Sequence, residues 1–413
     1  MKSYAKVAMA AALCGALAAG GMLAASGNVA AAEKKYDPGA SDTEIKIGNT
    51  MPYSGPLSAF GLIGRTISAY LDKVNAEGGI NGRKIKFISY DDSYSPPKTV
   101  EETRKLVEDD GVLLIFQSAG TASNTAIHKY LNARKVPQLF VASSAAKWGD
   151  PDHFPWTMGW SPSSQSEGRI FAQYLIANHP DGKIGILYPN DDSGRDYVKG
   201  LKDGLAGKLA IVSEQSYEAS DPTVDTQIIK LSTSGATIFF DAASAKFASL
   251  AIRKVNEIGW KPLHLLVSSS SSVGSVLKPA GLDKAKAIVT AYYLKDPTDP
   301  AWKDDADYKQ WSAFIDKYFP SGDRTSNMTV YGYATAQTLV EVLKRCGDDL
   351  TRENVMKQAA NLKNLHVGML LPGIVVDTSP TDFYPVKQMQ MMRFNGERWE
   401  LFGPVLNGAL GGT

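Results

Sequence analysis

Cysteine is nearly absent from this chain, which contains only Cys14 and Cys346 among its 413 residues. An internal disulfide would need both, and Cys14 lies in an N-terminal segment with the features of a removable leader. Cys346 alone provides neither a disulfide nor a thiolate metal site. We therefore expect Cys346 to be a small buried hydrophobe rather than a reactive group.

Recognisable catalytic patterns are also missing. The chain has no G-x-S-x-G nucleophile motif, and the serine run at 268–272 lacks an evident base partner. The acidic pairs Asp91-Asp92 and Asp191-Asp192 follow apolar strands in turn-like contexts, where Asp is usually a cap or turn former. No two of the five histidines have metal-ligand spacing: His128, His153, His179, His264 and His366. We predict no enzyme activity, no metal site and no cofactor.

The chain has little excess charge of either sign. It carries 44 Lys and Arg against 43 Asp and Glu, a formal net charge of +1. Loss of residues 1–32, which contain two lysines and no acidic residue, would change this to −1. A nearly neutral chain does not suggest a nucleic-acid partner.

The N-terminus resembles a secretory leader. Lys2 and Lys6 precede a stretch rich in Ala, Gly, Leu and Met, and the segment ends at Ala30-Ala31-Ala32. This order of charged, apolar and small-residue regions predicts a signal peptide cleaved after about Ala32. An uncleaved membrane anchor is the alternative, but the stretch is rich in glycine and weakly apolar. We therefore expect export.

The segment V-L-L-I-F-Q-S-A-G-T-A-S-N-T-A-I, residues 112–127, shows the chain's repeating plan. A short apolar run is typical of a strand buried on both faces of a parallel sheet, and a helix follows from about Thr121. Such a loop at a helix N-terminus presents free N–H groups and hydroxyls to an anion or polar ligand. It has neither a phosphate-loop lysine nor G-x-G-x-x-G. The alternative is an ordinary strand-to-helix turn.

Strands and helices alternate in two successive blocks after a flexible lead-in at 33–43. Expected strands cover 45–51, 84–90, 112–116 and 138–142, then 183–188, 210–217, 237–241, 264–268 and 287–294. Expected helices cover 57–75, from 96, 121–133, 166–178, 197–205, 223–232, 246–258, 304–318, 330–345 and 353–362, before a hairpin at 388–402. This alternation predicts an α/β fold of two doubly wound lobes.

Small polar loops follow the strands in both blocks. They cover 50–54, 118–121, 143–144, 191–194, 241–244 and 268–272. Ligands of doubly wound sheets bind outside the carboxyl ends of the strands. Two such ends facing each other would form a cleft lined by hydroxyls and N–H groups, which binds a small polar molecule by hinge closure.

Three segments carry a resemblance to a known family: I-K-I-G-N-T-M-P-Y-S-G-P-L (45–57), N-A-E-G-G-I-N-G-R-K-I (75–85) and Y-D-D-S-Y-S-P-P-K (90–98). They resemble periplasmic solute-binding proteins of ABC importers, in the class of the leucine/isoleucine/valine-binding protein. The resemblance covers nearly the whole mature chain. It implies two Rossmann-like lobes joined by a three-crossover hinge, with residues 44–160 plus 295–373 in the first lobe and 161–294 plus 374–413 in the second.

The same resemblance implies where the ligand binds. The main anchor falls on Gly120-Thr121 and the second on Ala142 and Ser144, while Phe60 packs on the ligand. Contributions from the second lobe fall on Asp192-Ser193, 241–243 and Ser269. The full set of expected ligand contacts is Phe60, Tyr94, Ser118, Gly120, Thr121, Ala142, Ser143, Ser144, Trp160, Asp192, Ser193, Asp241 and Ser269. Arg65, Arg169 and Arg195 are alternative counter-charges.

The chain departs from the amino-acid-binding pattern at three positions. Tyr94 stands where the family has a disulfide cysteine, Ala243 replaces an aromatic residue, and Ser269 replaces the acid that meets the ligand's ammonium. A buried ammonium without an acceptor is costly. The stretch K-W-G-D-P-D-H-F-P-W-T-M-G-W (147–160) further resembles a subgroup associated with aromatic and other organic acids as well as amino acids.

We therefore expect an aromatic carboxylate as ligand, bound beside Phe60, Tyr94, Trp148 and Trp160. An amino acid, an amide or urea is the alternative, and Asp241 would favour an amino acid if its carboxylate faces the cleft. Asp241 would otherwise accept a ligand phenol. The expected partner is an ABC permease, with the protein a periplasmic monomer. A ligand sensor and a secreted hydrolase are the competing functions.

Overall fold

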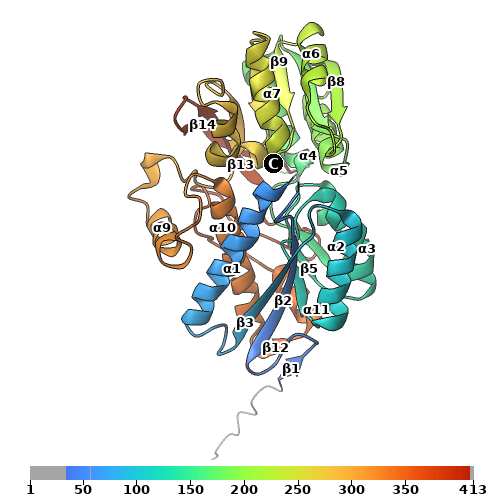
Figure 1. Ribbon diagram of the computed structural model, residues 1–413, viewed down its shortest axis with the longest axis vertical. Helices are drawn as coiled ribbons and strands as arrows, with labels where there is room; N and C mark the ends of the chain where they lie inside the picture. The colour runs from blue at the N-terminus through green and yellow to red at the C-terminus, as the bar shows by residue number, and fades with distance from the viewer. Residues whose placement is uncertain (1–33, 56, 410–413) are drawn as a thin grey trace, which may run out of the picture. The chain divides into compact units, whose positions relative to one another are not determined.

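The computed structural model describes residues 34–55 and 57–409 (Figure 1). The expected signal peptide, with Cys14, lies outside these residues. The predicted α/β fold of two doubly wound lobes is confirmed, because the structure contains two separate sheets with helices packed against them.

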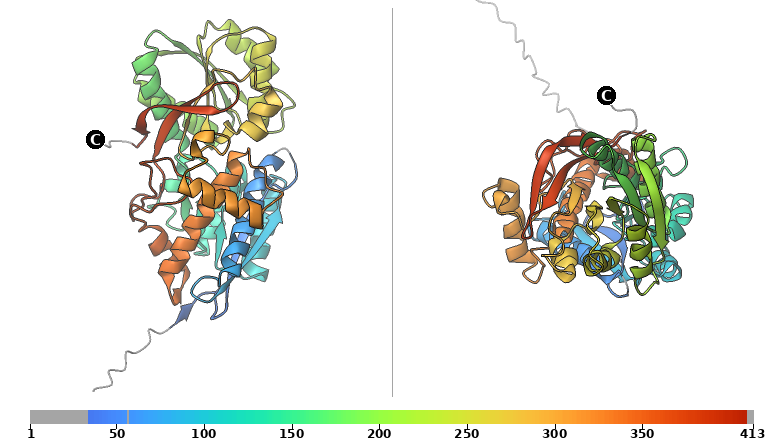
Figure 2. Two further views of the ribbon diagram at one scale, coloured as in Figure 1. Left: turned by 90° about the vertical axis from the view of Figure 1, so that its left-hand side faces the viewer. Right: turned by 90° about the horizontal axis from the view of Figure 1, so that it is seen from above.

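The first lobe contains a parallel five-stranded sheet in the order β3-β2-β4-β5-β6. Its strands are β2 (Glu44–Met51), β3 (Lys84–Asp91), β4 (Leu114–Phe116), β5 (Gln138–Val141) and β6 (Thr157–Gly159). Its helices are α1 (Gly61–Ala76), α2 (Pro96–Arg104), α3 (Thr121–Ala133), α9 (Ala306–Tyr318), α10 (Asn327–Cys346) and α11 (Arg352–Ala359). The late helices α9 and α10 pack against α1 (Figure 2).

The second lobe contains a seven-stranded sheet in the order β14-β13-β11-β10-β9-β7-β8. Its strands are β7 (Lys183–Pro189), β8 (Ala210–Tyr217), β9 (Ile238–Asp241), β10 (Leu263–Leu266), β11 (Val289–Tyr292), β13 (Gln388–Phe394) and β14 (Trp399–Asn407). Its helices are α4 (Ser164–Asn178), α5 (Asp192–Leu205), α6 (Asp225–Thr233), α7 (Ala245–Glu257) and α8 (Lys278–Ala280). The β13–β14 hairpin turns at Asn395-Gly396, as predicted, and is antiparallel to β11.

Every residue of the central strands β4, β5, β9 and β11 is buried. Helices cover both faces of such strands, so both sets of side chains are shielded from water and most of them are apolar, as in β4 with Leu-Ile-Phe. The chain passes between the lobes three times: after β6, after β11 and before β13. These are the three crossovers that the resemblance implied.

Each sheet contains a topological switch point, where successive strands lie on opposite sides of a central strand. In the first lobe β3 and β4 lie on opposite sides of β2, and in the second β8 and β9 lie on opposite sides of β7. The loops that leave neighbouring strands at such a point diverge, which opens a crevice at the carboxyl ends of the strands.

Three local expectations need correction. The lead-in carries β1 (Lys35–Tyr36), which pairs with β12 (Asp349–Leu350), because buried Arg83 bonds both Tyr36 and Asp348. Helix α5 begins five residues earlier than expected, since Asp191 caps it. The strand expected to reach Ser268 ends at Leu266, and 268–270 form a 3₁₀ turn.

Within the two described ranges, no helix is both long and apolar enough to cross a membrane. The same ranges contain no group of three His, Cys, Asp or Glu residues placed to hold a metal ion.

Candidate functional site

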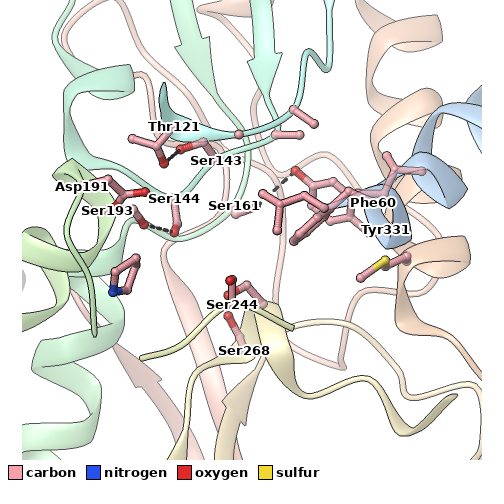
Figure 3. Close-up of a pocket in the computed structure, with 18 of the residues that line it drawn as sticks. Phe60, Thr121, Ser143, Ser144, Ser161, Asp191, Ser193, Ser244, Ser268 and Tyr331 are labelled. Carbon is pink, nitrogen blue, oxygen red and sulfur yellow. Dashed lines mark hydrogen bonds between the residues drawn. The ribbon is translucent and has the colours of Figure 1, made fainter. Parts of the chain in front are cut away.

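A pocket lies between the carboxyl ends of the two sheets (Figure 3). Loops after β2, β3, β4 and β5 form one wall, and loops after β7, β8, β9 and β10 form the other. Its lining residues include Phe60, Tyr94, Gly120, Thr121, Ala142, Ser143, Ser144, Ser161, Asp191, Ser193, Tyr197, Tyr217, Ser244, Ser268, Ser269, Tyr292, Tyr293 and Tyr331. The two switch points therefore contribute to one site.

Hydroxyl groups from both lobes meet on one side of this pocket. The Thr121 and Ser143 hydroxyl oxygens are 2.9 Å apart, and Trp148 Nε1 donates to Ser143 Oγ over 2.8 Å. Across the lobes, Ser144 Oγ lies 3.0 Å from Ser193 Oγ (Figure 3). A hydroxyl both donates and accepts, so this cluster can reorient toward a carboxylate.

The start of α3 forms the floor beside these hydroxyls. Gly120 is its N-cap with φ 91°, and a Cβ there would come within 2.0 Å of Tyr94 Cε2. Glycine suits this position because the backbone has a positive φ and the Tyr94 ring leaves no room for a Cβ. Thr121 is the first helical residue and makes no capping bond, so its hydroxyl is not the helix cap. Burial raises the pKa of Tyr94 to about 12, which keeps its phenol protonated at neutral pH.

The only charged side chain among the described lining residues is Asp191. Its Oδ1 accepts from the Gly194 N–H over 2.9 Å and so caps α5. Burial raises the Asp191 pKa, while the bond from Gly194 opposes the rise. No Lys or Arg of the described chain lines this pocket, so a ligand carboxylate would depend on neutral donors.

A buried carboxyl group lies behind the second-lobe wall. Glu167 accepts from the Ser268 N–H at 2.6 Å, from Ser268 Oγ at 2.8 Å and from the Tyr197 hydroxyl at 3.1 Å. Burial raises the Glu167 pKa to about 7. Because Glu167 accepts the hydrogens of both hydroxyls, their oxygens are left as acceptors for other groups.

Aromatic side chains form the rest of the wall. Phe60 stands at the start of α1, and Tyr331 projects from α10 nearby (Figure 3). Tyr331 receives bonds of 3.3 Å from Gln117 and from Ser161, and Ser161 in turn accepts from Tyr293 at 3.2 Å. These bonds fix the rings, so the pocket offers apolar ring surface in a set orientation.

Nine of the thirteen expected contact residues line the pocket: Phe60, Tyr94, Gly120, Thr121, Ala142, Ser143, Ser144, Ser193 and Ser269. The structure places the other four outside it. Ser118 is buried and bonded to Thr50, and Trp160 is buried with its indole N–H on Thr338. Contact of the nine with a ligand stays a prediction.

The expected ligand contacts of Asp192 and Asp241 need correction, because both carboxylates already have partners within the protein. Asp192 pairs with Lys147 at 2.5 Å and with Arg195 at 2.7 Å, which lower its pKa. Asp241 is fully buried, accepts from the Ala243 N–H at 3.0 Å and lies 3.1 Å from His264 Nε2. Its carboxylate therefore does not face the pocket, and it offers no partner to a ligand ammonium.

Sequence reasoning missed most of the pocket's tyrosines and its one acid. Tyr197, Tyr217, Tyr292, Tyr293 and Tyr331 all line the site. Tyr217 and Tyr292 are the last residues of their strands. An aromatic residue at the end of a strand can indicate from the sequence that it lines the pocket. The sequence predicts Asp191 as a cap or turn former in the 191–194 loop expected to line the cleft, but not as a ligand contact. It is a cap, as that reading implied, and it also lines the pocket.

Comparisons with known proteins agree on the family. The family model described as "Periplasmic binding protein" matches residues 44–398. A curated relative, Leu/Ile/Val-binding protein homolog 7 of Brucella abortus (strain 2308), is 23% identical over 374 residues, which cover 84% of this chain and 87% of the relative.

Two solved structures share the fold. One is a branched-chain amino acid ABC transporter protein from Thermus thermophilus with bound valine, with a TM-score of 0.80 and 16% identity over 89% of this chain and 97% of that chain. The other is a solute binding protein of an ABC transporter from Rhodopseudomonas palustris BisB5 in complex with 3,4-dihydroxy benzoic acid. Its TM-score is 0.74, with 19% identity over 89% of this chain and 98% of that chain.

Proposed function

The chain belongs to the periplasmic binding protein family, and from that premise we propose that it captures a small organic acid for an ABC importer. The favoured ligand is an aromatic carboxylate held in the interlobe pocket. The protein would work as an exported periplasmic monomer without enzymatic activity, and would deliver its ligand to permease subunits after the lobes close.

One observation carries the choice of ligand. The pocket joins a hydroxyl cluster at the start of α3 to a wall of phenylalanine and tyrosine rings. Its one acid, Asp191, already uses an oxygen as a helix cap. A carboxylate fits the Thr121–Ser143 end, where the α3 N-terminus adds a favourable dipole. An aromatic body fits the rings.

The R. palustris neighbour, crystallised with 3,4-dihydroxy benzoic acid, supports this reading as an analogy of fold. With its carboxylate at the Thr121–Ser143 end, an aromatic acid would place a ring hydroxyl opposite the carboxylate near the second-lobe wall. Asp191 and the oxygens of Ser268 and Tyr197 are acceptors there.

An amino acid remains the second candidate, and Asp191 is the observation that favours it. Its carboxylate could accept from a ligand ammonium, as the relative named for leucine, isoleucine and valine suggests. Buried ammonium groups need such an acceptor.

Calorimetry on ligand-stripped protein tests the proposal. Benzoate, hydroxybenzoates and phenylpropenoates would be titrated beside leucine, valine, glutamine and urea. We expect micromolar or tighter binding of at least one aromatic acid, about −8 kcal/mol or better. Tight binding of leucine or valine with no response to any aromatic acid would overturn the choice of ligand. Turnover of a bound ligand would overturn the binding role itself.

A further inference from the structure

A second cavity adjoins the main pocket and shares Leu57 and Phe60 with it. We call it the outer cavity. The segment before α1 forms one side, and α7 with Ser275 and with Pro279 of α8 forms the other. Its lining residues are Leu57, Ser58, Ala59, Phe60, Pro222, Ala245, Lys246, Ser249, Leu250, Arg253, Ser275 and Pro279. Leu57 and Phe60 therefore stand between two neighbouring spaces.

The outer cavity has the positive charge that the main pocket lacks. Lys246 and Arg253 lie seven residues apart on α7, about two helical turns, and so project on the same face. Within the described chain neither forms an ion pair. Lys246 Nζ lies 3.4 Å from the Asp221 carbonyl oxygen and 4.8 Å from the centroid of the Phe247 ring. No acidic side chain is among the described residues that line this cavity.

The N-terminus of α7 reinforces the two cations. The first turn of α7 begins at Ala245 in the same cavity, and its positive dipole end adds to the charge of Lys246 and Arg253.

We propose that the outer cavity is an anion-capture site that receives the carboxylate of an arriving ligand and passes it inward beside Phe60. This inference rests on the proposed function, since it takes the ligand to be a monocarboxylate. The main pocket has only neutral donors for the carboxylate, so the cations outside it raise the rate of entry. They make no contact with the ligand once it is bound in the main pocket.

The cations of the outer cavity should increase the association rate of the ligand and leave its dissociation rate unchanged. Clefts lined by charge of one sign raise association rates 10-fold to 1,000-fold. Two exposed cations belong below or at the low end of that range, so we expect a gain of about 3-fold to 10-fold in the association rate. Salt screens such charges over about 8 Å at physiological ionic strength, so the gain should shrink as salt is added.

Stopped-flow fluorescence with 3,4-dihydroxybenzoate tests this on the whole protein. The double variant Lys246→Gln/Arg253→Gln should associate 3-fold to 10-fold more slowly at low salt, with a flatter salt dependence and an unchanged dissociation rate. Lys208→Gln/Lys230→Gln removes two exposed cations elsewhere on the same lobe and should match the wild type. An association rate equal to that control, or a loss confined to dissociation, overturns the proposal.

A second measurement keeps the test independent of the main pocket's ligand. Fluorine NMR of trifluoroacetate should show line broadening by the wild type and by the control variant, and less by Lys246→Gln/Arg253→Gln. Equal broadening by all three proteins would overturn the capture site. If calorimetry finds no aromatic acid that binds while this difference persists, the proposed ligand fails and the anion site stands.

Discussion

Thr121 and Ser143 share one hydrogen bond between their hydroxyls, so one of the two hydrogens stays free for a ligand. Thr121→Val removes a donor from a charged acceptor, and we expect ligand affinity to fall by about 1–3 kcal/mol. Calorimetry measures the loss. Thr233→Val, at an exposed position of α6 and outside the pocket, should bind normally. Unchanged affinity in Thr121→Val would move the anchor elsewhere.

Asp191 discriminates between the two ligand classes. Asp191→Asn retains an oxygen that can cap α5 and removes the negative charge from the pocket wall. An aromatic carboxylate without a hydroxyl, such as benzoate, should then bind about as tightly or several-fold more tightly, because like-charge repulsion is lost. An amino acid would lose an ammonium partner, so weaker binding of leucine or valine would identify the alternative. Competition titrations with both classes decide it.

The raised pKa of Glu167 should make the free energy of unfolding depend on pH. Its pKa rises from an ordinary 4.5 to about 7 in the folded protein, so the folded state holds this proton more tightly than the unfolded state. The resulting stabilisation, about 3 kcal/mol, is present below pH 4.5 and is lost as pH rises through 7. Denaturant titrations should show that the free energy of unfolding of wild type minus Glu167→Gln falls across this window. A flat difference contradicts the prediction.

The sequence predicts which residues follow the strands, but it does not predict the direction of each side chain. Small polar residues after strands located Gly120, Thr121, Ser143 and Ser193 in the pocket, because strand ends of a parallel sheet share one edge. The direction of a side chain is a tertiary property. Asp241 ends its strand as predicted, yet it turns toward His264 rather than into the pocket. Tyr331 approaches from helix α10, which begins more than two hundred residues after Gly120.

At the scale of elements, α4 and α5 pack with unusually little space between their backbones. A Cβ on Gly200 would come within 2.2 Å of the Gln165 carbonyl oxygen, and one on Gly168 within 2.6 Å of the Leu201 nitrogen. The two helices begin at the site, with Ser164 and Ser193 hydroxyls 2.8 Å apart. Their contact therefore sets the position of the second-lobe hydroxyls.

Gly200→Ala should disturb this contact. The added methyl group meets backbone atoms, which cannot rotate away, so we expect about 1–3 kcal/mol less stability in denaturant titrations. Ligand affinity should fall as Ser193 shifts. Lys199→Ala, at an exposed position of the same helix, should change stability by less than about 0.5 kcal/mol. Equal stability of the two variants would show that the helices can separate without cost.

The order of elements was predictable because hydrophobic runs and helical stripes repeat strongly. Helix α3 and strand β8 have the expected bounds. Strand β1 was not predictable, since its two residues show no period and its pairing partner β12 lies more than three hundred residues away. The start of α5 was missed because its first turn is polar and Asp191 could cap at more than one position.

For the whole molecule, the three crossovers and the cross-lobe contacts predict a closing motion. Lys147 pairs with Asp192 at 2.5 Å, and the Ala146 N–H donates to Asp196 at 2.6 Å. A ligand that touches both lobes binds the closed arrangement better and so shifts the population toward it. Small-angle scattering should show a smaller radius of gyration at saturating ligand. An unchanged radius, with binding confirmed by calorimetry, would contradict hinge closure.

Cys346 is the one cysteine in the described part of the chain, and its burial makes the protein a convenient base for an optical sensor. Burial raises its pKa to about 12, so its thiol stays protonated and closed to maleimide reagents. A cysteine introduced at exposed Ser58, beside Phe60, would then be the only reactive thiol in the described part of the chain. An environment-sensitive dye attached there would change its emission as ligand passes into the main pocket, and would read the protein's own preference among candidate compounds in a microplate.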